Sequence, residues 1–332
     1  MHIKGDNMAT INFKNTYIKD YFTIIGPKEK DSKLSGYDIS IEDYYYKCKT
    51  FEMAEIKMQK VVIDNLINKN NLCDKNIDYL IGGDLINQIS LTSFNAKYYR
   101  IPFIGIYEAC ATFPLSIIMA SNMIDAKNAN NIICITSSHN LTAERQFRYP
   151  TEYGSLRPNT ATVTATASVG AIVSSDISKI KITSGTIGKA IDLGVNDVNH
   201  MGAIMAPACA DTLYEHLKDL NIKPNYYDLI LTGDLGCVGL DILKEYYYNV
   251  YHEKLNNIMD SGCEIYLNSE NTYSGGSGPC CLPLVFFCKI LKNKKYRKVL
   301  LLGTGSLHSP TLVNQHLSIP AVSHAISIEV LS

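Results

Sequence analysis

The sequence predicts an α/β fold made of two copies of one β-α-β-α-β unit, related by a pseudo-twofold axis. The first observation is an internal repeat, because residues 66–85 align without a gap with residues 216–235. Asp84 and Asp234 take the same place in the two copies, and apolar residues face each other at most of the preceding strand positions. The second observation is that strands alternate with helices in each copy, which is typical of β-α-β units and predicts a mostly parallel sheet buried on both faces.

Each copy has the same order of elements: an amphipathic helix, a buried strand ending in Gly-Asp, a cysteine followed by a long apolar helix, and a second buried strand. In the first copy we expect these elements at residues 51–70, 79–84, 110–124 and 131–140. In the second copy we expect them at residues 203–220, 229–234, 280–291 and 298–306. The second copy begins near Ser178, so the sequence predicts two halves, residues 1–178 and 179–332.

Composition and charge favour a globular protein that binds a small molecule or another protein. The chain has 332 residues, 46% of them hydrophobic, which is enough for two core-sized units. Its 31 basic and 32 acidic residues give a net charge of -1. This balance provides no general basic field, so nucleic acid and anionic lipid are disfavoured as partners.

The ten cysteines include no C-x-x-C pair and no zinc-like spacing, so we expect them to be reduced thiols and expect no metal site. The N-terminal residues lack the apolar run of a signal peptide, which favours an intracellular protein. Residues 102–124 are mostly apolar, but they contain Gly105, Glu108 and Pro114. A strand followed by a buried helix explains them better than a membrane span.

A duplicated unit with a cysteine at the start of the buried helix of its first copy resembles the thiolase superfamily. This resemblance implies a five-layered αβαβα fold in which two such halves stack. Longer runs resemble one family within it, the stage V sporulation protein AD family. These runs are G-P-K-E-K-D at 26–31, G-D-L-I-N-Q at 83–88, T-S-S-H-N at 136–140, A-E-R-Q-F-R-Y-P-T-E-Y-G at 143–154, I-D-L-G at 191–194 and L-I-L-T-G-D-L at 229–235.

Cys110 takes the position of the superfamily's nucleophile. In a condensing enzyme, the positive end of a helix lowers the thiol pKa, and a histidine and a further His or Asn from the second half complete the site. Here Gly233 or Asp234 stands at the first of these positions, and residues 274–276 stand at the second. A carboxylate beside Cys110 would raise the pKa of the thiol. We therefore expect a remnant nucleophile without its catalytic partners; the plainer alternative is a cysteine packed in a core.

Other candidate ligand-binding residues each have a structural alternative. His139, at a strand end, is either a ligand or a hydrogen-bonded structural residue. Asp84 and Asp234 either face the ligand or, more simply, cap the following helices, which is favoured over a metal role. Gly275 and Gly276 lie in a G-G-S-G run that lacks the lysine of a phosphate loop, so nucleotide binding is disfavoured.

Arg145 and Arg148 are candidates for carboxylate recognition. Planar guanidinium groups bind carboxylates bidentately and stack on rings, as a planar pyridine dicarboxylate would require. The alternative is a solvated loop stapled by an i,i+4 pair between Glu144 and Arg148.

The family resemblance implies the function. It implies a soluble component of the spore dipicolinate transport system, which binds dipicolinic acid, with calcium, in a remnant cleft and uses no cofactor. It also implies integral membrane proteins as partners, a peripheral position on the spore inner membrane and a homodimer formed through an edge strand of the first half. The competing hypotheses are an acyltransferase or condensing enzyme using Cys110 with a base such as His139, and a purely structural transporter subunit.

Overall fold

The computed structural model describes residues 3–5, 8–32, 34–147, 157–266 and 271–331. The strands are β1 Ile3–Gly5, β2 Met8–Ile25, β3 Ile39–Ser40, β4 Tyr79–Gly83, β5 Phe103–Gly105, β6 Asn131–Ser138, β7 Val163–Thr164, β8 Ala167–Ser174, β9 Ile180–Ile187, β10 Leu229–Thr232, β11 Ile258–Asp260, β12 Gly276–Ser277, β13 Lys298–Ser306 and β14 Ala321–Val330. The α-helices are α1 Pro27–Asp31, α2 Phe51–Lys69, α3 Ser90–Ala96, α4 Thr112–Asp125, α5 Asn140–Phe147, α6 Met201–Leu220, α7 Gly236–Tyr251, α8 Ser261–Ile265, α9 Cys281–Val285 and α10 Pro310–Val313. Short 3-10 turns include η3 Ala109–Ala111, and α9 continues as the π-helical turn η5 Phe286–Ile290.

One large sheet joins the two halves of the chain. Its strand order is β11-β10-β13-β14-β9-β2-β8-β6-β4-β5, with β2 and β9 paired at the centre. Outward from the centre, the second half runs β9-β14-β13-β10-β11 and the first half runs β2-β8-β6-β4-β5. The two orders correspond strand for strand, as a pseudo-twofold arrangement requires.

The expectation of a mostly parallel sheet is wrong. Along the main strand order, the parallel pairs are β4 with β5 and β6, and β10 with β11 and β13. The two-residue strands β3 and β12 also pair parallel, with β2 and β7. The pairs from β6 through β8, β2, β9 and β14 to β13 are antiparallel. The outer parallel strands are linked by helical crossovers, such as α4 between β5 and β6 and α7 between β10 and β11, which parallel neighbours need.

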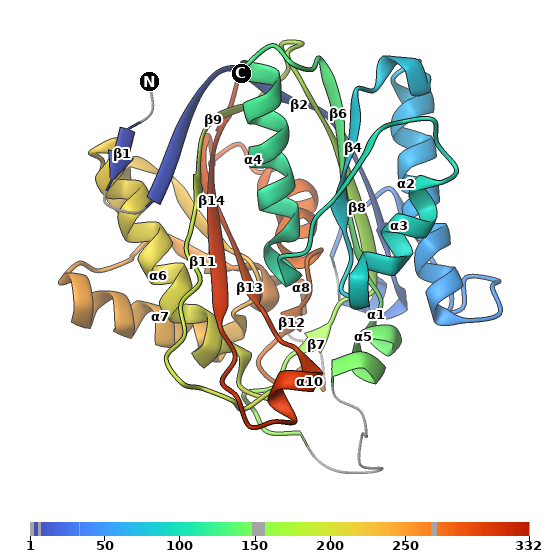
Figure 1. The fold of residues 1–332 in the computed structure, drawn as a ribbon. Helices are drawn as coiled ribbons and strands as arrows, with labels where there is room; N and C mark the ends of the chain where they lie inside the picture. The colour runs from blue at the N-terminus through green and yellow to red at the C-terminus, as the bar shows by residue number, and fades with distance from the viewer. Residues whose placement is uncertain (1–2, 6–7, 33, 148–156, 267–270, 332) are drawn as a thin grey trace.

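Helices and sheet form the five layers (Figure 1). α2 and α3 cover one outer face, and α6 and α7 cover the other. The two halves of the sheet face each other across α4, which contacts β2, β6 and β4 of the first half and β13 and β14 of the second. The fold-class prediction is therefore confirmed, and α4 is the buried central helix that the apolar sequence after Cys110 predicted.

Local sequence explains where the outer helices begin and end. α2 starts after Thr50, whose hydroxyl accepts a hydrogen bond from Met53 N, as an N-cap residue does. α6 starts after His200 and ends at Asn221, which adopts a left-handed φ of 52°. These ends agree within about two residues with the ranges expected from amphipathic periodicity, which fixes a helix's centre better than its ends.

Candidate functional site

A pocket opens between the two halves, where the carboxyl ends of several strands meet. It holds about 470 Å³ of space, including its open mouth. Residues from both halves line it: Leu85, Ala109, Cys110, Ala143, Phe147 and Thr164 from the first, and Met201, Met205, Ser277, Ser306 and His308 from the second. Most of these side chains are apolar, with a few polar groups among them, as is usual for small-molecule sites.

The turn before α4 places Cys110 in the pocket wall, partly exposed to it. Ala109, the preceding residue, adopts a left-handed φ of 48°, which is unusual for a residue with a Cβ and is often found at functional sites. The turn also packs closely on β13. A Cβ on Gly305 would lie 2.2 Å from the carbonyl oxygen of Glu108, so only glycine permits this approach.

The thiol of Cys110 is hydrogen-bonded to the carboxylate of Asp234. Burial raises the pKa of Cys110 well above its usual value, and the negative charge of Asp234 raises it further. The site therefore holds Cys110 as a neutral thiol that donates to a carboxylate. This is the opposite of the depressed thiol pKa that a cysteine nucleophile requires.

Asp234 is fixed by its other partners. Its Oδ2 accepts from Gly278 N at 3.0 Å and Ser277 Oγ at 3.3 Å, and its Oδ1 accepts from Thr304 Oγ1 at 3.1 Å. Burial raises the pKa of Asp234 to about 6, even though the hydrogen bonds from Cys110, Gly278 and Thr304 lower it. Asp234 thus joins two other segments of the second half, at residues 277–278 and at Thr304, to the cysteine of the first.

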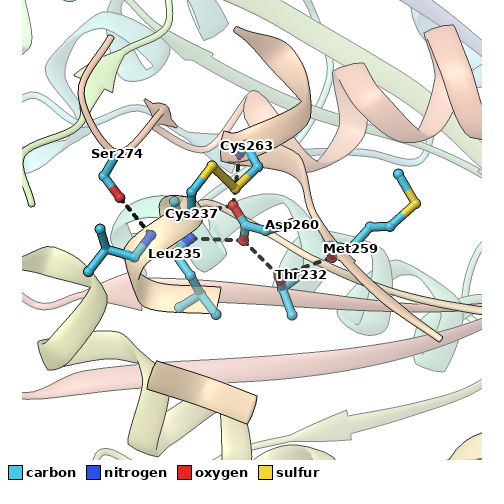
Figure 2. Close-up of a disulfide and its surroundings, with 9 residues drawn as sticks. Thr232, Leu235, Cys237, Met259, Asp260, Cys263 and Ser274 are labelled. Atoms are coloured by element: carbon cyan, nitrogen blue, oxygen red, sulfur yellow. Dashed lines mark hydrogen bonds between the residues drawn. A yellow bond between two sulfur atoms is a disulfide. The ribbon is translucent and has the colours of Figure 1, made fainter. Parts of the chain in front are cut away.

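Asp260, and not Asp234, organises the start of the helix that follows. Its carboxylate accepts from Leu235 N and Gly236 N, both at 3.0 Å, and from Cys263 N at 3.1 Å, where it caps α8 (Figure 2). The expectation that Asp234 caps a helix is wrong, because its carboxylate turns toward the pocket wall. The same expectation for Asp84 is confirmed: its Oδ2 accepts from Thr92 N, in the first turn of α3, at 2.8 Å.

A disulfide joins Cys237 at the start of α7 to Cys263 in α8 (Figure 2). The expectation that all ten cysteines are reduced is therefore wrong. The two residues are 26 positions apart, but the fold brings their Cα atoms to 5.2 Å, within the range that a disulfide spans. No local C-x-x-C spacing signals such a pair. The bond ties together two elements that flank the loop carrying Ser277 and Gly278.

His308 and Ser306 are pocket residues that the sequence did not single out. They end β13 and begin the loop after it, in the run G-T-G-S-L-H. The His308 ring lies 5.2 Å from the Phe147 ring, centroid to centroid, so one aromatic group from each half meets in the pocket wall. The Ser306 hydroxyl is buried and has no hydrogen-bond partner among the described residues. The signal available in the sequence was a serine and a histidine directly after an apolar strand of the second copy.

His139 is fully buried and lies outside the set of pocket-lining residues. Its Nε2 lies 2.9 Å from the carbonyl oxygen of Tyr44 and donates to it, and its Nδ1 accepts from Leu141 N at 3.2 Å. The ring stacks on Phe51. Burial lowers the pKa of His139, so the neutral form with both nitrogens bonded is favoured. These contacts correspond to the structural alternative.

The described part of the arginine-containing run lies on α5. Arg145 forms an ion pair with Glu52 of α2, and its side chain is 59% exposed. Glu144 forms an ion pair with Arg157 at 2.7 Å. The partner expected from the sequence was Arg148. Arg148 lies outside the described residues. Neither Arg145 nor Arg157 lines the pocket formed by the described residues.

Asp84, Gly275 and Gly276 lie near the pocket wall without lining it. Next to Asp84, Leu85 reaches the pocket, and next to Gly276, Ser277 does. Gly275 has a φ of 117°, and its carbonyl oxygen accepts from Val163 N at 2.9 Å, which joins this loop to β7. These glycines shape the loop that presents Ser277.

Within the described ranges, no group of three or more His, Cys, Asp or Glu side chains is arranged to hold a metal ion. None of the helices in that part of the chain combines the length and apolarity needed to cross a bilayer.

The layered fold and the cysteine at the start of the central helix define a thiolase-like protein. Many solved structures share this fold, and two of them serve as examples. One is 3-oxoacyl-[acyl-carrier-protein] synthase III from Aquifex aeolicus VF5, with a TM-score of 0.57 and 13% identity, covering 95% of this chain and 99% of that one. The other is acetamide-bound OleA of Xanthomonas campestris, with a TM-score of 0.58 and 12% identity, covering 96% and 100%.

The chain belongs to the stage V sporulation protein AD family, whose model matches residues 7–329. Stage V sporulation protein AD of Bacillus subtilis (strain 168) is 41% identical over 323 residues, covering 94% of each chain. The family resemblance noted in the sequence is thereby confirmed.

Proposed function

We propose that this chain is a binding protein of the spore dipicolinate transport system and that it takes dipicolinic acid, together with calcium, in the pocket beside Cys110 without performing acyl transfer. Membership of the sporulation family supports the setting. The observation that carries the proposal is the hydrogen bond from Cys110 to Asp234. It places a carboxylate at the position where a condensing enzyme needs an imidazole, and the negative charge keeps the thiol protonated.

The polar groups of the pocket suit a small planar acid. The Ser306 hydroxyl, which has no partner within the described ranges, is free to donate to a ligand carboxylate. The rings of Phe147 and His308 supply flat surfaces for an aromatic ligand. Arg145 would have to leave Glu52 to reach a ligand, and Arg148 is the other candidate for a bidentate contact.

Calorimetric titration with dipicolinic acid, with and without calcium, tests the proposal. Ser306→Ala and His308→Ala should weaken binding, while Arg297→Ala, at a distant exposed arginine, serves as the control. If Arg145 or Arg148 binds a carboxylate, its replacement by alanine should lower the affinity about ten- to hundredfold. The absence of heat and of thermal stabilisation, with the ligand well above micromolar concentration, would refute the proposal.

A second candidate function is acyl transfer. It is favoured by the left-handed Ala109 before Cys110 and by an imidazole in the same pocket, which belongs to His308 and not to His139. Incubation with acyl-coenzyme A, followed by intact mass measurement of the parent and of Cys110→Ala, separates the two functions. A mass gain that depends on Cys110 would establish the enzyme reading.

The protein's setting is also part of the proposal. Integral membrane proteins of the same transport system would hold the chain on the spore inner membrane. A homodimer would form through β5, which is an edge of the sheet and belongs to the first half. Sedimentation analysis of the parent and of a β5 variant such as Ile104→Lys checks the dimer.

A further inference from the structure

A basic surface lies at the end of the molecule opposite the pocket. The chain between Lys289 and Lys298 carries six basic residues and no acidic one, although the whole chain is balanced in charge. This segment includes the loop that connects η5 to β13. β13 starts at Lys298 and ends at Ser306 in the pocket, so the two ends are about 26 Å apart along the strand. In Figure 1 this end lies at the top, near the C-terminus.

Lys179, at the start of β9, adds to the surface, because Leu331 N donates to its carbonyl oxygen at 2.8 Å. A shallow hollow is lined by Lys179, Lys294 and Arg297 together with Leu291, Tyr296 and Leu331. Lys179, Lys294, Lys295 and Arg297 are exposed, and none of them forms an ion pair with a described residue. These four residues form the basic end surface.

Hydrogen bonds hold the backbone of the loop that carries these side chains. Arg297 N and Lys298 N both donate to Asp228 Oδ2 at 2.8 Å, and Lys295 N donates to Asn293 Oδ1 at 3.1 Å. The acidic side chains close by have other partners. Asp228 accepts hydrogen bonds from these backbone groups, and Asp176 forms an ion pair with Lys19. Glu329 lies opposite Lys298 in the strand register.

Exposed apolar groups lie beside the charges. Ile177, two residues before Lys179, is 83% exposed. Tyr226 is 47% exposed, and the Lys298 ammonium lies 4.2 Å from the centre of its ring. An exposed isoleucine is unfavourable in water but fits the boundary between lipid headgroups and acyl chains, where tyrosine is also enriched.

We propose that the basic end surface docks the protein directly on an anionic membrane, with lipid phosphates in the hollow and Ile177 at the acyl boundary. An anionic leaflet attracts clustered lysines and arginines. A nucleic acid would use the charges but leave Ile177 in water, so lipid accounts for more of the surface. The pocket, at the far end, would then face away from the membrane. The inference is independent of the proposed ligand.

Vesicle sedimentation tests the inference with the full-length protein. The parent should bind phosphatidylcholine vesicles that contain phosphatidylglycerol, should not bind vesicles of phosphatidylcholine alone, and should be released by high salt. The double variant Lys294→Ala/Arg297→Ala should bind about 25-fold more weakly, at roughly fivefold for each charge removed. The matched control Lys47→Ala/Lys49→Ala removes two exposed charges near the start of α2 and should bind like the parent.

Ile177→Ser separates the apolar contribution from the charges: binding should fall several-fold while its salt dependence remains. Equal binding to both kinds of vesicle, binding to neither, or equal binding by the parent and the double variant would overturn the inference. Displacement from vesicles by inorganic phosphate, beyond that caused by chloride at the same ionic strength, would assign the hollow to a free anion and also overturn it. Unchanged thermal unfolding midpoints exclude misfolding as the cause.

Discussion

The thiol of Cys110 donates a hydrogen bond to the carboxylate of Asp234, across the boundary between the two halves of the fold. This contact joins the turn before α4 to the segment that follows β10. The negative charge of the carboxylate stabilises the protonated thiol and disfavours a thiolate.

Replacing Asp234 should make Cys110 more reactive. In Asp234→Asn the negative charge is gone while a hydrogen-bonding side chain remains, so the pKa of Cys110 should fall, although burial still raises it. The rate of alkylation by iodoacetamide, followed against pH at the Cys110 peptide, measures this pKa. The exposed Cys73 is an internal control whose profile should not change. Identical profiles at Cys110 in both proteins would show that Asp234 does not govern the thiol.

Cys110→Ala should fold and remain within about 1 kcal/mol of the parent in free energy of unfolding, because the thiol borders a pocket and its loss leaves only a small cavity. Urea unfolding measures the difference. Cys134→Ala, at a fully buried cysteine in the core, is the comparison and should cost more. A loss of several kcal/mol at Cys110 would show a tightly packed core position.

The disulfide predicts a defined thiol count and a stability difference. Denatured without reductant, the protein should show eight free thiols of its ten cysteines. Cys237→Ser should lower the free energy of unfolding by about 2–4 kcal/mol, because the bond closes a loop of intermediate length in the unfolded chain. The parent in reductant should approach the stability of the variant. Ten reactive thiols in the protein denatured without reductant would contradict the pairing.

Glu29 predicts a pH-dependent stability. This carboxyl is 1% exposed, accepts a hydrogen bond from the Tyr266 hydroxyl, and has its pKa raised by burial to about 7 from 4.5. Between pH 4.5 and about pH 7, the two pKa values, the folded state binds more protons than the unfolded state. The free energy of unfolding that this group contributes therefore falls as the pH rises. Glu29→Gln cannot ionise and should therefore gain stability relative to the parent between about pH 5 and pH 8, by on the order of 1–3 kcal/mol.

Urea unfolding of the parent and of Glu29→Gln, each at about pH 5 and about pH 8, gives this difference in free energy of unfolding. Glu42→Gln, at an exposed carboxyl, is the matched control and should show little change with pH. A Glu29→Gln effect that is the same at pH 5 and pH 8 would mean that Glu29 ionises at its usual pKa.

Much of the fold was readable from the sequence because it depends on local periodicity and on the repeat. The helix around residues 51–69 and the strand ending at Gly83 reappear, 150 positions later, as α6 and β10. Strand direction in the centre of the sheet was not readable, because β2 and β9 lie far apart in the chain and their pairing depends on long-range register.

The sequence by itself determined the repeated order of elements and the buried helix after Cys110. These are properties of local pattern and of alignment between the copies. Only the tertiary structure decided which side chains meet: His308 and Ser306 in the pocket instead of His139, Asp260 instead of Asp234 at a helix start, and Cys237 joined to Cys263. Each of these contacts joins segments separated in the chain. Their distances follow from how strands and helices pack, and the spacing of residues along a sequence does not encode those distances.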